Sequence, residues 1–320
     1  RVIKKGNHMP KHKIAVIGAG NVGATTAMRC AERQLGDVVM IDIAEGRAEG
    51  KALDMAQSAS LELFEGSVKG TTDFGALKGA GIVVITAGFP RKPGMSRADL
   101  LAINGRIIEE TSRHIQKNAP EAIVVVVTNP LDSMAYLTKK HTGFDRKRVI
   151  GMGGILDSAR LTCFLSERLG VAPKDISALV IGAHSKSMVP LARFSTVNGI
   201  ALDQILESDA LDEIFEKTRN AGAQIVSLLK DGSAYYATSS AIVRLVAGII
   251  RDEGVQLPCS VFLEGEYGIH DVFCGVPVTI GKAGLKEVIQ LALNDQELGL
   301  FQESARAVKE AIAEIDIPIV

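Results

Sequence analysis

The first half of the chain alternates short apolar runs with longer segments in which apolar and polar residues mix. The apolar runs are bounded on both sides, as buried parallel strands usually are. They predict strands at 13–17, 37–42, 66–70, 81–86, 122–128 and 148–151. The segments between them predict helices at 21–35, 44–60, 97–118 and 131–141. This alternation is typical of an α/β fold, a doubly wound parallel sheet with helices on both faces.

The pattern changes after Gly151. A helix is expected to start near residue 155, followed by a strand at 177–182, short β-like runs within 188–200, long helices near 207–230 and 238–251, strands at 259–264 and 271–280, and an amphipathic helix at 297–315. Helices mixed with antiparallel strands predict a second, α+β domain. We place the first domain at 9–150 and the second at 151–320. Residues 1–8, before Met9, are expected to be an N-terminal addition or a disordered segment.

A glycine motif follows the first predicted strand directly. It reads Gly18-Ala19-Gly20-Asn21-Val22-Gly23 and opens the first predicted helix. Glycines at this spacing permit a tight turn, close approach of the backbone to a pyrophosphate, and close packing of helix on strand. The helix would also direct free N–H groups and the positive end of its dipole at the phosphates.

An acidic residue closes the second predicted strand. Asp42 lies 19 residues after Gly23, where a carboxylate would accept hydrogen bonds from the adenosine ribose. Alone, the glycine spacing is compatible with an ordinary turn. Strand, glycines, helix, strand and terminal acid in one unit predict dinucleotide binding. The acid favours NAD over NADP, because it would repel a 2′-phosphate.

Two further segments follow strands at the carboxyl edge of the predicted sheet, where ligands bind in open α/β folds. The loop at 86–97 carries the cations Arg91, Lys92 and Arg97. It is either a solvated basic loop or a lid that brings cations onto an anionic substrate. Asn129 ends a buried strand, where its amide could hydrogen-bond a ligand or simply form an Asn-Pro turn.

Composition narrows the classes of partner and compartment. Hydrophobic residues make up 47% of the 320, enough for a sizeable core, and 36 basic residues balance 37 acidic ones. That balance gives no support for nucleic acid or a membrane surface as partner, and no apolar run reaches the roughly 18–20 residues of a membrane span. The segment before Met9 lacks the apolar region of a signal peptide. The four cysteines show no C-x-x-C spacing, which favours free thiols in the cytoplasm.

Five spaced motifs together resemble the lactate/malate dehydrogenase family, and within it the malate dehydrogenases that are most similar to lactate dehydrogenase. The resemblance covers nearly everything from Lys13 to Glu314. The motifs are the glycine turn at 18–23, Pro90-Arg91-Lys92-Pro93-Gly94-Met95-Ser96-Arg97, Thr128-Asn129-Pro130-Leu131-Asp132, Ile155-Leu156-Asp157-Ser158-Ala159-Arg160, and His184 ahead of Met188-Val189-Pro190.

The resemblance implies catalytic roles that the chemistry supports. Oxidation of a 2-hydroxy acid removes a hydroxyl proton while a hydride leaves carbon, and histidine suits the proton step because its pKa lies near working pH. By resemblance His184 is this acid/base, and Asp157 holds its tautomer and stabilises its cationic form. Arg160, which shares a helix face with Asp157, would bind the substrate C1 carboxylate with two hydrogen bonds. Arg97 would swing in with the lid and polarise the carbonyl oxygen.

The resemblance also implies which residues contact NAD. Asn129 would contact both the substrate and the nicotinamide side, and no metal site is expected. The expected NAD contacts are Gly18, Gly20, Asn21, Val22, Gly23, Asp42, Asn104, Val127 and Asn129.

Arg91 is expected to choose the substrate. In the family the malate enzymes have arginine here and the lactate enzymes typically have glutamine. A second carboxylate buried without a cation would be very costly, and a buried Arg91 facing a methyl group would be unpaired. The resemblance therefore implies a small dicarboxylate, malate or oxaloacetate, with another 2-hydroxy acid such as lactate as the alternative. Relatives form dimers or tetramers, so a homo-oligomer is expected.

The chain departs from the family beside the expected acid/base. Family members usually have glycine and aspartate after this histidine, whereas this chain has Ser185 and Lys186. A glycine-like φ at Ser185 would strain the turn, and an inward Lys186 would lower the pKa of His184. An outward Lys186 would change little. A milder departure is Thr238, near a position where malate enzymes often have proline. The alternative from another class is an NAD-binding protein whose catalysis is weakened.

Overall fold

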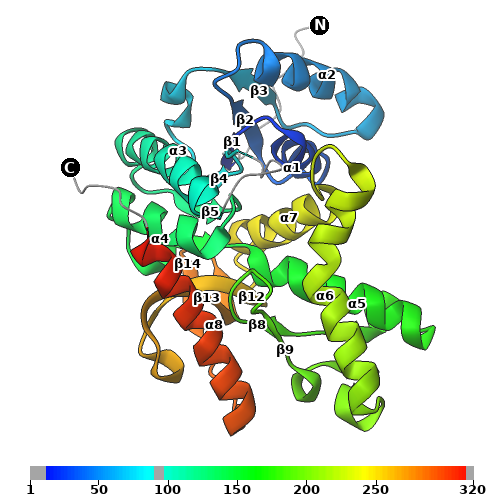
Figure 1. Ribbon diagram of the computed structural model, residues 1–320. Coiled ribbons are helices and arrows are strands. Elements are labelled where there is room, and N and C mark those ends of the chain that lie inside the picture. The colour runs from blue at the N-terminus through cyan, green and yellow to red at the C-terminus, as the bar shows by residue number, and fades with distance from the viewer. Residues whose placement is uncertain (1–11, 90–96, 315–320) are drawn as a thin grey trace, which may run out of the picture.

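The computed structural model describes residues 12–89 and 97–314 (Figure 1). Its first half forms six parallel strands in the order β3-β2-β1-β4-β5-β6, which is the doubly wound dinucleotide-binding arrangement. The predicted α/β fold is confirmed. The strands are β1 (Lys13–Ile17), β2 (Asp37–Ile41), β3 (Val68–Thr71), β4 (Ile82–Ile85), β5 (Ile123–Val126) and β6 (Val149–Gly151).

Four helices connect these strands at nearly the predicted positions. They are α1 (Asn21–Glu32), α2 (Arg47–Glu62), α3 (Arg97–Asn118) and α4 (Leu131–Thr142). Helix α1 starts at the glycine motif, with Gly20 as its extended N-terminal cap. Helix α4 ends where Gly143 takes a left-handed φ of 68° and donates its N–H to the Lys139 carbonyl. Glycine is the residue that enters this conformation most readily.

The second half extends the same sheet with antiparallel strands. Strand β12 (Val255–Glu264) joins the edge of β6 through the pair Ser260 and Gly151, and β13 (His270–Gly281) and β14 (Gly284–Val288) follow outward. Strands at 259–264 and 271–280 were expected, but β14 was not. The sheet of nine strands therefore runs through the predicted boundary between residues 150 and 151.

The remaining elements, apart from the helix at 236–250, lie mainly in the lower part of the molecule in Figure 1. Helix α8 begins with a capping box, in which Asn294 and Glu297 each accept a backbone N–H of the other. The single strand expected at 177–182 is instead two short strands, β7 and β8, which belong to two small sheets, β7-β10-β11 and β8-β9. The runs expected within 188–200 supply the other strands of these sheets. The elements are α5 (Gly153–Leu169), β7 (Ile176–Ser177), β8 (Val180–Ile181), β9 (Val189–Pro190), β10 (Thr196–Val197), β11 (Ile200–Ala201), α6 (Ser208–Leu229), α7 (Tyr236–Ile250) and α8 (Asp295–Ala313).

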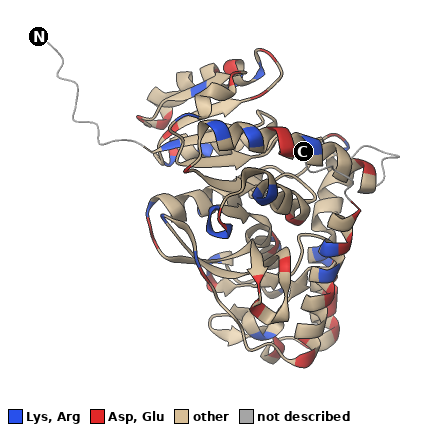
Figure 2. Ribbon diagram, turned by 90° about the vertical axis from the view of Figure 1, so that its left-hand side faces the viewer, with Lys and Arg blue, Asp and Glu red and all other residues tan. Residues whose placement is uncertain are grey.

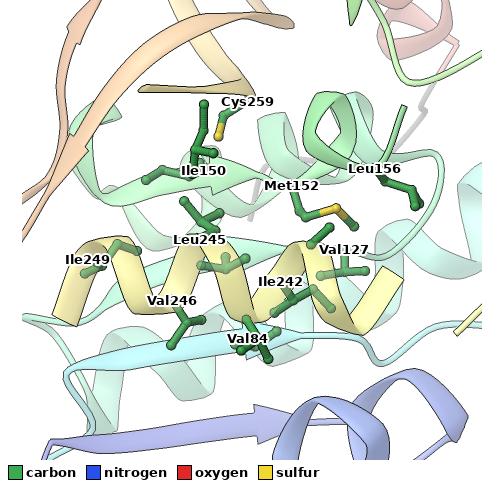
Figure 3. Close-up of a cluster of buried hydrophobic side chains, with 14 of the residues drawn as sticks. Val84, Val127, Ile150, Met152, Leu156, Ile242, Leu245, Val246, Ile249 and Cys259 are labelled. Carbon is green, nitrogen blue, oxygen red and sulfur yellow. The ribbon is translucent and has the colours of Figure 1, made fainter. Parts of the chain in front are cut away.

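Helix α7 packs on the face of the sheet although it comes from the second half of the chain. Figure 3 shows Ile242 and Leu245 of α7 directed at Val84 of β4 and Ile150 of β6, and all four are fully buried. Full burial of such a side chain contributes about 1.5–3 kcal/mol. The core therefore joins the two halves and holds the carboxyl edge of the sheet in a fixed relation to the second half.

Charged residues of both signs are interspersed over the ribbon in Figure 2. In the described part of the chain no helix is long and apolar enough to cross a membrane. Within the same residues, no group of three or more His, Cys, Asp or Glu side chains could hold a metal ion.

Candidate active site

The glycine turn between β1 and α1 is tightly packed at two of its three glycines. Gly18 has a φ of 100°, and a Cβ there would lie 2.7 Å from the Ala87 backbone nitrogen. A Cβ at Gly23 would lie 1.8 Å from the Gly18 carbonyl oxygen. Both contacts are with backbone, which cannot yield. Gly18 therefore makes the turn, and Gly23 lets helix α1 lie close against β1.

Gly20, the middle glycine of the turn, is open instead. A Cβ at Gly20 would meet no atom within 4 Å. Gly20 caps α1, and among the described residues no side chain caps the first N–H groups of that helix, which begins at Asn21 and Val22. A side chain here would occupy space in front of the free helix N-terminus. The absence of one leaves room for a pyrophosphate to approach the backbone, so the turn fits a dinucleotide.

Asp42 follows β2 and keeps acceptor capacity. One carboxylate oxygen accepts from the Ala19 N–H at 2.7 Å, and the other accepts from the Ala44 N–H at 2.9 Å. A carboxylate offers about four lone-pair sites, so two remain for ribose hydroxyls. Lys51, which no sequence motif indicated, donates from its Nζ to the Ala19 carbonyl at 2.8 Å. Lys51 places a cation on the same turn of backbone, from α2.

Side chains tie together the strand ends at the carboxyl edge of the sheet. Thr86, after β4, donates to the Gly18 carbonyl at 3.0 Å, and Thr128, after β5, donates to the Ala87 carbonyl at 2.6 Å. Asn104 of α3 is 2% exposed, and its amide bonds the backbone of Phe89 and Asn129. These contacts occupy the amide of Asn104 in holding the edge together. Its expected contact with NAD stays a prediction.

The structure brings His184 and Asp157 together, although they lie 27 residues apart. Nδ1 of the His184 ring lies 2.7 Å from a carboxylate oxygen of Asp157. Only 2% of the Asp157 side chain and 13% of the His184 side chain are exposed. Burial lowers the pKa of His184, but the charge and hydrogen bond of Asp157 raise it, and the pKa is raised overall. This ring can therefore hold and release a proton in a defined orientation.

Arg160 joins this pair from one helical turn further along α5. Its Nη1 lies 3.4 Å from the other oxygen of Asp157, and 15% of the Arg160 side chain is exposed. Helix α6 approaches the guanidinium closely, because a Cβ at Gly222 would lie 3.4 Å from Nη2. Asp157 thus contacts an acid/base candidate with one oxygen and a cation with the other. The cation suits a carboxylate ligand.

Two more side chains, which the sequence analysis assigned no role, hold the backbone of the His184 loop. Asp132, in the first turn of α4, accepts the N–H of His184 at 2.8 Å. Ser304 of α8 accepts the N–H of Ala183 at 2.9 Å. Asp132 was visible in the sequence only as the last residue of a motif, and nothing near Ser304 in the sequence indicated this contact.

The departure at Ser185 and Lys186 leaves the buried pair intact. Both residues are exposed, and Ser185 is not among the described residues with a positive φ. The Ser185 hydroxyl accepts the N–H of Ser187 at 3.2 Å and lies 2.8 Å from the Ser187 hydroxyl. Of the two arrangements left open by the sequence, the structure shows an unstrained serine and an outward lysine.

The remaining predicted site residues are placed only in part. Arg91 lies outside the described residues, and of Arg97 only the backbone, at the start of α3, is described. Val127 is 8% exposed just beyond β5, and Asn129 is exposed at the same carboxyl edge. The hydroxyl of Thr238 donates to the Ala234 carbonyl at 3.0 Å within its own helix.

Two family models match consecutive parts of the chain. The model described as lactate/malate dehydrogenase, NAD binding domain, matches residues 12–151, and that described as lactate/malate dehydrogenase, alpha/beta C-terminal domain, matches residues 155–316. The chain belongs to the lactate/malate dehydrogenase family. The fit of the glycine turn and Asp42 to a dinucleotide agrees with the first model, and the cofactor of this family member is NAD.

Relatives of known name are similar over nearly their whole length. A malate dehydrogenase of Roseiflexus sp. (strain RS-1) is 46% identical over 94% of this chain and 97% of that relative. One from Pelodictyon phaeoclathratiforme is 48% identical over 93% of this chain and 96% of its own.

Solved structures of both branches of the family superpose about equally well on the chain. The malate dehydrogenase of Cryptosporidium parvum has a TM-score of 0.93 at 40% identity, covering 95% of this chain and 99% of its own. The lactate dehydrogenase of the same organism, complexed with lactic acid and NAD, has a TM-score of 0.94 at 36% identity, covering 97% and 100%. The fold therefore does not separate the two substrates.

Proposed function

We propose that this dehydrogenase interconverts (S)-malate and oxaloacetate. The observation that carries the proposal is the buried contact of Asp157 with both His184 and Arg160. Asp132 ties this unit to the carboxyl edge of the NAD-binding sheet, because it follows β5 and accepts the His184 N–H. The unit places a proton-transferring ring beside a carboxylate-binding cation, and a 2-hydroxy acid needs both.

Each residue of the unit has a defined task in the proposed reaction. His184 gives its proton to the keto oxygen in reduction and takes it from the hydroxyl in oxidation. Asp157 keeps the proton on Nδ1 in the neutral ring, so that Nε2 faces the substrate, and it stabilises the cationic ring. Arg160 binds the C1 carboxylate and so orients C2. NAD, when bound, accepts the hydride from C2 or returns it.

Substrate choice is proposed to rest on Arg91 of the loop after β4, with Arg97 as the second cation that this loop brings to the substrate. The names of the relatives support malate, and Arg91 matches the arginine of the malate enzymes. Both arginines have side chains outside the described residues, so these roles rest on the resemblance and on charge. A dicarboxylate brings a second carboxylate that needs its own cation.

Steady-state assays with oxaloacetate and pyruvate test the proposal directly. Oxaloacetate should be preferred, and Arg91→Gln should reduce its turnover and raise that of pyruvate. Loss of a cation opposite a buried carboxylate costs roughly 3–5 kcal/mol, or about two to four orders of magnitude in kcat/KM. Arg113→Gln makes the same chemical change at an arginine whose side chain is 60% exposed. It should leave the turnover of both oxaloacetate and pyruvate unchanged. Retained oxaloacetate preference in Arg91→Gln would mean that another cation, such as Lys92, reads the second carboxylate.

A catalytically weakened NAD-binding protein is not favoured. That alternative required Ser185 or Lys186 to disturb the acid/base. Both are exposed, and His184 keeps its 2.7 Å contact with Asp157.

We also propose that the chain acts as a homo-oligomer in the cytoplasm. Large apolar side chains remain exposed on α2 and at the end of α6, where Leu61 is 81% and Leu228 is 75% exposed. A second copy would shield such surfaces from water. The four cysteines are free thiols, which favours a reducing compartment. Sedimentation of the purified protein tests the oligomer.

A further inference from the structure

A second buried carboxylate, Asp132, contacts the backbone of His184, whereas Asp157 contacts its ring. Asp132 is 5% exposed. One of its oxygens accepts the backbone N–H of His184 at 2.8 Å, and the other accepts the hydroxyl of Ser260, on β12, at 2.6 Å. The proposed reaction gives Asp132 no task, although burying a carboxylate is costly.

The contacts of Asp132 suit its ionised form. A backbone N–H can only donate, and the Ser260 hydroxyl donates as well, so both oxygens act as acceptors. Burial has the largest effect and raises the pKa of Asp132, and the charge of Asp157 raises it as well. These two hydrogen bonds lower it, and the pKa is raised overall. Its place in the first turn of α4 adds the positive end of that helix dipole. The two donors and the helix dipole therefore offset part of the cost of burying a negative charge.

The His184 loop is anchored at three consecutive residues, and only one anchor is charged. Gly182 exchanges two backbone hydrogen bonds with Gly275 of β13, at 2.8 and 3.0 Å. Ala183 donates its N–H to the Ser304 hydroxyl, and His184 donates to Asp132. Ser304 and Asp132 thus each accept a backbone N–H, from adjacent residues of the loop. They differ in that Asp132 also brings a charge.

The charges near His184 come from several elements. Asp157 favours the protonated ring most strongly and Asp132 favours it as well, while burial and Arg160 oppose protonation. Cys274 of β13 is buried, and its pKa is raised well above the ordinary value, so it stays neutral. Lys186 is exposed, and Arg219 of α6 donates to the Met188 carbonyl at 3.3 Å. The described anions that act on this ring are thus Asp157 and Asp132.

We propose that Asp132 is a positioning residue for the acid/base step, fixing the His184 backbone and favouring the protonated ring through its charge. This rests on the proposed function of His184. Asp132 is buried and its described hydrogen bonds are with His184 and Ser260, so we infer that it acts through His184. Reduction of the keto acid starts from the protonated ring, so Asp132 serves that direction most at higher pH.

Asp132→Asn separates the charge from the anchor. The amide oxygen can still accept the His184 N–H, and the NH₂ group can donate to the Ser260 oxygen. Ser304→Ala is the matched control, because it removes the neighbouring anchor and changes no charge. Two measurements apply to all forms: the pH profile of kcat/KM for oxaloacetate, and an NMR titration of the His184 ring without substrate or cofactor. The ring signals are assigned with His184→Asn.

In Asp132→Asn the alkaline limb of the profile and the NMR titration of His184 should both move to lower pH. At pH values above that limb, kcat/KM should fall about three- to tenfold, with a smaller loss below it. In Ser304→Ala the alkaline limb and the His184 titration should stay at the pH values of the parent, even if kcat changes. If Asp132→Asn does not fold, Ser260→Ala provides the test. Loss of the Ser260 hydrogen bond destabilises the ionised form of Asp132, so the His184 titration should again move to lower pH.

An unmoved His184 titration in the folded variant would overturn the inference. A shift as large in Ser304→Ala would also overturn it, since anchoring alone would then account for the effect. An NMR shift with an unmoved kinetic profile would support the action of Asp132 on His184 and refute the acid/base role of His184.

Discussion

Asp157→Asn is the sharpest single test of the candidate site, because it changes one buried atom type and leaves the shape in place. In the parent, Asp157 lies 2.7 Å from the His184 ring and 3.4 Å from Arg160. The asparagine can turn its NH₂ group toward Nδ1, which would then act as acceptor and put the proton on Nε2. It also leaves Arg160, at 15% exposure, without its carboxylate.

The expected loss follows from these contacts. Removal of one member of a buried, hydrogen-bonded charge pair costs about 3–5 kcal/mol. Each 1.36 kcal/mol is about tenfold in rate, so kcat/KM for oxaloacetate should fall by about two to four orders of magnitude. Most of the loss should be in kcat, because the cationic ring is needed in the reaction itself. NADH binding to the free enzyme should stay within about twofold, since the glycine turn is untouched.

The pH dependence of kcat/KM shows in which pH range Asp157→Asn should lose most activity. Asp157 raises the pKa of His184, and reduction needs the protonated ring. Activity in reduction is therefore present below that pKa and is lost as pH rises through it. Without Asp157 the alkaline limb should move to lower pH, so the variant should be most impaired at alkaline pH.

Stopped-flow reduction of oxaloacetate by NADH, followed across pH, measures both effects. Asp175→Asn is the matched control, since Asp175 pairs with Lys174 at the surface, where such pairs contribute about 0–1 kcal/mol. The reasoning is refuted by an Asp157→Asn enzyme that is folded, keeps kcat/KM within about tenfold of the parent, and shows an unmoved limb.

Three further predictions concern the cofactor, the substrate carboxylate and the departure beside His184. NAD should be preferred over NADP by a large factor, and Asp42→Ser with Ile43→Arg should move the preference toward NADP; equal efficiency of the parent with NADPH would contradict this. Arg160→Lys keeps the charge but loses the planar fork, so KM for oxaloacetate should rise steeply while NADH titration is unchanged; an unaltered KM would refute the role of Arg160. Ser185→Gly with Lys186→Asp should change kcat/KM by less than about tenfold, or ~1.4 kcal/mol, and a gain of several hundredfold would show that the parent is impaired.

Features that depend on one short segment of the chain could be predicted from the sequence. The glycine turn was predicted together with the strand before it, because two of its glycines are required by the local backbone. Gly18 takes a φ of 100°, and Gly23 has no room for a Cβ. Most of the six parallel strands were also readable locally, since they are bounded apolar runs; β3, which reads Val-Lys-Gly-Thr, is not one. Element ends shifted by a few residues, as for α2, which starts at Arg47 rather than at residue 44.

Residue roles at the site came from the family motifs, and the tertiary structure decided how those residues meet. His184 and Asp157 lie 27 residues apart, and Asp132 lies 52 residues before His184. No periodicity in the chain relates these positions. Their distance depends on how α4 and α5 pack around one loop, and the strand edge at Ser260, 128 residues from Asp132, completes the arrangement.

The sheet shows the same division. Amphipathic pattern indicates that a strand or helix has a buried face, but it does not say which element covers that face. From the sequence, the strands that became β12 and β13 were expected to belong to a separate domain. In the structure they extend the first sheet, and α7 covers its face with Ile242 and Leu245. Apolar burial is non-directional, so many partners would satisfy the pattern equally well. By itself the sequence determined the local geometry of the NAD turn and the family. Only the packing of distant elements decided the charge environment in which His184 holds its proton.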